Sequence, residues 1–143
     1  MEKLKENIEK IVSDLNYYLY DMEYVKENKE NVLRIMIEND TEIDIEDCVI
    51  VSRAISEFLD QNDPFVDPYN LEVTSPGAER ELRTSEEIKR AVGKQVYIET
   101  VEQKIEGEMI SYKDGFIEIK YKNKRTTKIN EIDVNFIRLA IVF

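Results

Sequence analysis

The stretch Tyr69-Asn70-Leu71-Glu72-Val73-Thr74-Ser75-Pro76-Gly77 decides how the chain divides. Its first six residues alternate between apolar and polar side chains, which predicts a strand with one buried face. Ser75-Pro76-Gly77 then ends the strand, because proline and glycine favour turns. Before this breaker the helical and strand periods are mixed, and after it short β-rich runs dominate. We therefore expect two domains, residues 1–82 and residues 83–143, in an α+β fold.

The N-terminal domain is predicted to be an α/β unit in the order helix, strand, strand, helix, strand. Apolar side chains at steps of three and four over residues 4–15 predict the first helix. Asn16 suits its end, because asparagine tolerates the left-handed conformation. Alternation of apolar and polar side chains within residues 20–37 predicts a β-hairpin with one solvent-exposed face. Asp44 is expected to cap the second helix, and the proline-containing residues 60–68 to form a loop.

The C-terminal domain is predicted to be a small closed β-barrel entered through one short helix. Thr84 and Glu87 have the spacing of a capping box for that helix. Lys113-Asp114-Gly115 has the composition of a hairpin turn. Five β-rich runs at roughly ten-residue spacing are typical of a small barrel. They are residues 96–101, 105–112, 116–121, 126–129 and 135–141.

Composition excludes several classes of activity. The chain has no histidine and a single cysteine, Cys48, so an internal disulfide, a Cys/His zinc site and a histidine-based triad are excluded. Cys48 shares an apolar helical stripe, so we expect a buried structural thiol and not a nucleophile. No segment could span a bilayer and no secretory leader follows Met1, which favours a soluble, cytoplasmic protein. We predict no catalytic, cofactor or metal site.

An oxygen-rich loop leaves a metal-dependent enzyme open as a weaker alternative. Asp60, Asn62, Asp63 and Asp67 carry the oxygen ligands that calcium prefers, but their spacing does not fit an EF-hand. A solvated acidic loop is the simpler interpretation.

The charge is divided unequally between the two predicted domains. The whole chain has 20 Lys plus Arg and 31 Asp plus Glu, a net charge of -11. Residues 1–82 contain 8 of the basic and 21 of the acidic residues, and residues 83–143 contain 12 and 10. The net charges are therefore -13 and +2. We expect the acidic domain to prefer a basic partner.

Six cations lie on or beside two predicted strands and their turn, opposed over sixteen residues only by Asp114 and Glu118. They are Lys113, Lys120, Lys122, Lys124, Arg125 and Lys128. Two interpretations are open: lysines can protect an exposed strand edge from aggregation, or they can contact RNA phosphate. The neighbouring Tyr112, Phe116 and Tyr121 are candidates for base stacking.

The stretch from residue 69 to residue 82 resembles the signature of the bacterial ribosome maturation factor family RimP. The family carries Tyr-x-Leu-Glu-Val-Ser-Ser-Pro-Gly-x-x-Arg-Pro-Leu at the junction of its two domains. Here Thr74 replaces a serine, and Glu81 replaces the proline that would stiffen the chain after Arg80. The likeness extends upstream to Asp47-Cys48, Ser52-Arg53 and Leu59-Asp60.

The resemblance implies a non-catalytic factor that binds the immature small ribosomal subunit and assists its assembly. The implied partners are the strongly basic twelfth small-subunit protein and pre-subunit rRNA. The implied fold is a KH-like first domain followed by an Sm-like or SH3-like barrel, and we expect a monomer. The Gly-x-x-Gly loop by which KH modules clamp RNA is missing from this sequence. A free Sm-like small-RNA-binding protein is the alternative hypothesis.

Seven residues form the candidate partner-binding set. Glu72 and Arg80 lie within the signature and are predicted to form an ion pair that sets the geometry of the junction. The other five are the cations of the basic strands and their turn. They are Lys120, Lys122, Lys124, Arg125 and Lys128. For a protein partner, an added strand at the sheet edge is the expected binding mode.

Overall fold

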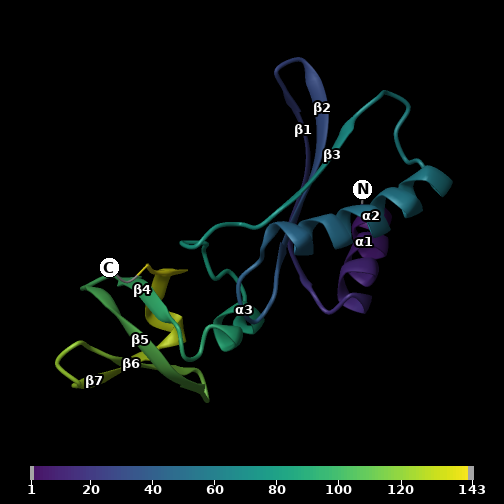
Figure 1. Cartoon of the computed structure of the whole chain (residues 1–143). Coiled ribbons are helices and arrows are strands. Elements are labelled where there is room, and N and C mark those ends of the chain that lie inside the picture. Colours follow the sequence, from purple (N-terminus) through teal and green to yellow (C-terminus); the bar gives the residue numbers. More distant parts are fainter. Residues whose placement is uncertain (1, 142–143) are drawn as a thin grey trace. The chain divides into compact units, whose positions relative to one another are not determined.

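The computed structural model of the chain describes residues 2–141. The chain forms two compact units that divide between Pro76 and Gly77. Each unit has its own sheet and its own hydrophobic core (Figure 1). The mixed α+β class predicted from the sequence is confirmed. None of the helices within residues 2–141 is long and apolar enough to cross a membrane.

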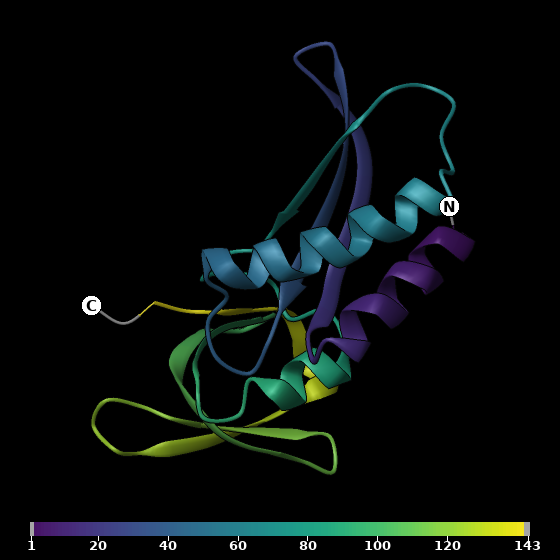
Figure 2. The same cartoon turned by 45° about the vertical axis from the view of Figure 1, so that its right-hand side comes forward.

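The first unit has the predicted order of elements. They are α1 (Glu2–Asp14), β1 (Tyr18–Glu27), β2 (Glu30–Glu38), α2 (Ile45–Gln61) and β3 (Asn70–Thr74). Strand β2 lies in the middle of the sheet, antiparallel to β1 and parallel to β3. Both helices cover the same face of the sheet, as Figures 1 and 2 show. Leu33, Ile35 and Ile37 of β2 are fully buried beneath them.

Caps and turns explain where these elements begin and end. Asn16 has a φ of 68° after α1, in the left-handed region, as predicted. Asn28 and Lys29, with φ values of 48° and 68°, form the two-residue turn of the β1–β2 hairpin. Asp44 caps α2 as predicted, and it forms a reciprocal capping box with Asp47.

A hydrogen bond ties the α1–β1 connection to the first turn of α2. The Tyr17 hydroxyl donates to the Asp47 carboxylate, which also accepts the backbone N–H of Asp44 at 2.9 Å. The bond to Asp47, reinforced by burial, raises the pKa of Tyr17 to about 12. The backbone N–H of Asp44 and then the Tyr17 hydroxyl lower the pKa of the Asp47 carboxyl.

Aromatic packing holds the loop that precedes β3 against the β1–β2 hairpin. The rings of Tyr24 and Phe65 stack with their centroids 4.1 Å apart, and Phe65 meets Tyr69 edge to face at 5.0 Å. The sequence predicted a loop here, but alternation and spacing could not show that Phe65 would pack across the chain. The loop is therefore anchored at its centre.

The second unit contains α3 (Ser85–Arg90), β4 (Gln95–Thr100), β5 (Lys104–Lys113), β6 (Phe116–Lys120), β7 (Thr126–Asn130), a 3₁₀ turn η1 (Glu131–Asp133) and β8 (Val134–Leu139). Thr84 caps α3 as predicted, but the capping box is only half formed, because the Glu87 carboxylate accepts the N–H of Arg83 at 2.7 Å in place of that of Thr84. The strands form one antiparallel sheet in the order β7-β6-β5-β4-β8. Ile129 and Ile137, from the two end strands, share one core with Ile88 of α3.

The prediction of a closed barrel was wrong at the closing step. Within residues 2–141, β7 and β8 are the two ends of the sheet and do not pair with each other. The outer edge of β8 is bonded instead to the junction segment. The N–H of Leu82 donates to the carbonyl of Ile137 at 2.9 Å, and the N–H of Leu139 donates to that of Arg80 at 3.0 Å. Closure requires the end strands to meet, and short β-rich runs do not show whether they do.

We expect Tyr17→Phe to lower the free energy of unfolding by about 1 kcal/mol near neutral pH, because a part-buried hydrogen bond is lost. The contribution of Asp47 is present above its unfolded pKa of 3.8 and is lost as the pH falls through its lowered folded value. That of Tyr17 is lost as the pH rises from 10.0 to about 12. The difference between the two proteins should therefore be largest between these limits.

Urea denaturation of both proteins across this pH range measures the effect. Tyr18→Phe is the control, because the Tyr18 hydroxyl donates to Asp40 over a longer, exposed 3.3 Å bond. An equal loss in the two variants, or a loss that does not change with pH, would contradict the assignment.

Candidate functional site

The five candidate cations of the second unit gather on one hairpin. Strands β6 and β7 pair from Phe116 opposite Asn130 to Lys120 opposite Thr126, and the connecting turn follows (Figure 2). We name β6, β7 and this turn the basic hairpin. All five cations are exposed on it: Lys120, Lys122, Lys124, Arg125 and Lys128. The two strands that the sequence expected to be neighbours are thus paired directly.

The turn of the basic hairpin is held by its own backbone. The N–H of Tyr121 donates to the carbonyl of Arg125 at 2.8 Å, and the N–H of Lys124 donates back to that of Tyr121 at 3.0 Å. The side chain of Asn123 accepts the N–H of Arg125 at 2.9 Å. Lys124 has a φ of 69°, in the region that favours glycine. Lys124 therefore has a backbone conformation that costs free energy for any residue with a side chain.

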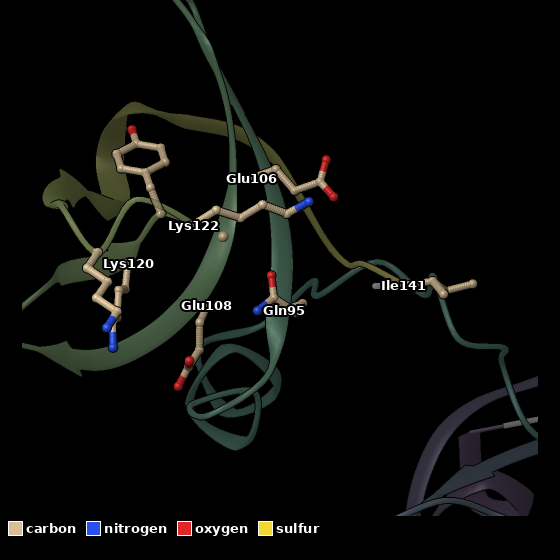
Figure 3. A pocket seen from close by; sticks show the side chains of 9 residues that line it. Gln95, Glu106, Glu108, Lys120, Lys122 and Ile141 are labelled. Carbon is tan, nitrogen blue, oxygen red and sulfur yellow. The ribbon is translucent and has the colours of Figure 1, made fainter. Parts of the chain in front are cut away.

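A pocket of about 630 Å³ lies beside the basic hairpin (Figure 3), and we name it the hairpin pocket. Register places Gln95 of β4, Glu108 of β5 and Lys120 of β6 in one row. In Figure 3 the Lys122 side chain reaches toward Glu106. The full lining is Gln95, Glu106, Gly107, Glu108, Lys120, Tyr121, Lys122, Lys124 and Ile141.

Gly107 allows the close approach of β5 and β6 beneath this pocket. A Cβ atom at this position would lie 2.6 Å from the carbonyl oxygen of Lys120 and 2.7 Å from Cγ2 of Ile119. A larger residue would push the two strands apart. The flanking Glu106 and Glu108 point away from the core by the alternation of the strand.

These two carboxylates were not predicted as part of the site. Between residues 113 and 128 two carboxylates oppose six cations, and Glu106 and Glu108 lie outside that range. Glu106 and Glu108 come from β5 and line the same pocket as the lysines. Alternation in β5 marks both as outward-facing, but only strand pairing shows that they face the cations.

The candidate stacking residues are placed differently from one another. Tyr112 and Tyr121 pack partly against the core of the second unit. The Tyr112 hydroxyl also donates to Glu131 at 2.6 Å, and this bond raises the pKa of Tyr112. Phe116 is 45% exposed. Of the three, Phe116 offers the most ring surface.

Glu72 and Arg80 each have partners within their own unit. Glu72 of β3 accepts from the Arg34 guanidinium, with 3.2 Å between Nε and Oε1. Arg80 donates from Nη1 to the carbonyl of Gly77 at 3.3 Å. Gly77 has a φ of 102°, which explains why the signature has glycine at this turn. The ion pair between Glu72 and Arg80 would join the two units and stays a prediction.

Arg34 organises the open face of the first sheet. The hydrogen bonds to Glu72, then to Glu27 and Glu23, raise the pKa of Arg34. Its Nη2 lies 2.7 Å from Glu27, and Nη1 pairs with Glu23. One cation thus meets three carboxylates, so this face keeps an excess of negative charge.

Cys48 is partly buried in α2, and burial, followed by the charges of Asp47 and Asp44, raises the pKa of its thiol. A raised pKa disfavours the reactive thiolate. Among residues 2–141 no group of three or more Cys, Asp or Glu side chains is arranged to hold a metal ion.

These features define a class: a two-unit α+β protein whose units differ in charge. Residues 1–76 contain 7 Lys plus Arg and 19 Asp plus Glu, whereas residues 77–143 contain 13 and 12. A family model described as the RimP N-terminal domain matches residues 7–79, which are more than half of the 143 residues. The chain belongs to the RimP family, a family of ribosome maturation factors.

We expect Gly107→Ala to destabilise the second unit by about 1–3 kcal/mol, because the new methyl group overlaps the backbone of β6. Thermal unfolding followed by circular dichroism measures this loss. Glu106→Ala is the matched control, since it changes the adjacent exposed residue. A Gly107→Ala protein as stable as the control would show that the two strands can separate without cost.

Proposed function

We propose that this chain assists assembly of the small ribosomal subunit, without catalysis, by binding a basic small-subunit protein and pre-subunit rRNA. Membership of the RimP family supports a role in ribosome maturation. The unequal charge of the two units is the main observation that supports binding of these two partners. Opposite charges steer association and favour different partners. We place this role in the cytoplasm, on the immature subunit.

The first unit is suited to a basic protein, for which the resemblance implies the twelfth small-subunit protein. A surface pocket of about 560 Å³ is lined by Asp60, Asp63 and Asp67 together with Tyr69 and Val66. Val66 is fully exposed. The carboxylates match lysine or arginine head groups, and the apolar surface matches their aliphatic stems.

The second unit is suited to rRNA through the basic hairpin. Its five cations are exposed side by side on two paired strands and their turn. Contacts from such side chains to phosphate supply affinity that does not depend on sequence and weakens with salt. The overall charge of -11 does not prevent this contact, because the acidic excess belongs to the first unit.

We also propose that the first unit is KH-like and the second Sm-like. The α-β-β-α-β order and the five-stranded antiparallel sheet after a short helix support these assignments. A free Sm-like ring is the less favoured alternative. A head-to-tail ring needs two complementary free edges, and residues Arg80 and Leu82 already bond to the outer edge of β8. We therefore favour a monomer.

Reversing the charge of Lys120, Lys122, Lys124 and Arg125 to Glu should weaken association with small-subunit precursors at least tenfold and leave folding intact. Exposed charges rarely contribute more than about 1 kcal/mol to stability. Co-sedimentation with precursor particles from cells grown in the cold measures the association. The matched control reverses four exposed lysines of the first unit: Lys3, Lys5, Lys10 and Lys26. Equal binding by both variants and the unchanged chain would refute the proposed role of the hairpin.

The full chain should behave in solution as a monomer of 16.9 kDa. Light scattering coupled to gel filtration measures the mass. A mass of several chains, as in a closed ring, would instead favour the Sm-like alternative.

A further inference from the structure

We propose that the hairpin pocket binds single-stranded RNA and selects bases that carry an amino group, while its lysines hold the adjoining phosphates. This inference rests on the proposed contact with rRNA. It adds the place where a base is bound and the chemistry by which bases are distinguished.

The pocket has two kinds of wall. Lys120, Lys122 and Lys124 come from β6 and the turn, and Glu106 and Glu108 come from β5. Lysine offers only donors and a positive charge, which suit phosphate, whereas an ionised carboxylate can only accept hydrogen bonds. A ligand that carries an anion and hydrogen-bond donors close together can satisfy both walls.

A nucleotide with an amino group on its base meets this requirement. Adenine, cytosine and guanine each present an exocyclic amine that a carboxylate can accept, and cytosine's amine is an established partner of Glu and Asp. Uracil has no exocyclic amine, and its single N3–H donor lies between two carbonyl oxygens, which the carboxylates would repel. Single-stranded RNA exposes these base edges, whereas a duplex does not.

The size of the pocket and the charge around it match a strand that continues beyond one nucleotide. A volume of about 630 Å³ lies within the usual range of ligand pockets, roughly 300–1,000 Å³. Outside the pocket, Arg125 and Lys128 are two further exposed cations of the basic hairpin, and Glu118 lies opposite Lys128. A strand that extends beyond the pocket can therefore meet these two cations.

The turn offers this site little ring surface for stacking, and it places a lysine in the pocket. Tyr121 is half-buried and packs against the core, so its ring is largely occupied. Lys124 keeps its charge at a φ of 69°, where glycine would fit without strain. Its side chain lines the pocket.

Fluorescence anisotropy with the full chain and labelled eight-nucleotide RNAs tests the inference. We expect oligo-A and oligo-C to bind about tenfold more tightly than oligo-U, which corresponds to one base-specific contact. The double variant Glu106→Gln, Glu108→Gln should reduce this preference below about twofold, because the amide can also donate to the uracil carbonyls.

Lysine variants test the phosphate wall separately. Changing Lys120, Lys122 and Lys124 to Gln should weaken binding to all three RNAs and reduce the slope of log affinity against log salt by about 2, at ~0.7 per phosphate contact. The single variant Lys124→Gly should weaken all three as well. Lys29→Gly is its matched control, because Lys29 is exposed, has nearly the same φ of 68° and lies in the first unit.

Equal affinity of the unchanged chain for the three RNAs would overturn the inference, and so would an unaltered preference in the double glutamate variant. A Lys29→Gly protein that loses as much affinity as Lys124→Gly would also count against it. Co-sedimentation with subunit precursors but no base preference would remove only this inference. Base preference without co-sedimentation would remove the proposed role in assembly and leave the pocket assignment standing.

Discussion

Each sheet of this chain buries one face in a small core, and this constraint decides where the charges lie. In β2, Leu33 and Ile35 point toward the helices, so Arg34 between them faces outward. There it meets carboxylates from both neighbouring strands: Glu23, Glu27 and Glu72. The pairing holds three strands in register and leaves negative charge on the open face. The negative charge on the open face of the first sheet therefore follows from the burial of its other face in the core.

The same constraint produces the mixed pocket of the second unit. Ile105 and Met109 of β5 enter the core, and Gly107 between them lies against β6. Glu106 and Glu108 are therefore presented on the outer face beside the lysines of the basic hairpin. A uniformly basic surface would bind any nucleic acid. Carboxylates among the cations repel some ligands and accept from others, which is how a binding site gains specificity.

Local features were predicted well because their causes lie within a few residues. Asn16 ends α1 in the left-handed conformation, and Asp44 and Thr84 cap helices through bonds to residues three positions away. The strands were likewise predicted from the alternation of apolar and polar side chains alone. The capping of helices and the positions of strands therefore follow from short stretches of sequence. Features that join distant segments were predicted less well, such as the packing of Phe65 on Tyr24 and the separation of β7 and β8 at opposite ends of the second sheet.

The sequence by itself determined the α+β class, the order of the elements, the family signature and the concentration of acid in the first half of the chain. These depend on side-chain period, on caps and on composition, all of which are local or additive. Only the tertiary structure decided that Arg80 and Leu82 bond to β8 and that Glu106 and Glu108 face Lys120 and Lys122. Hydrogen-bond register between strands sets both arrangements. Register depends on which strands meet, and a single strand's sequence does not contain that information.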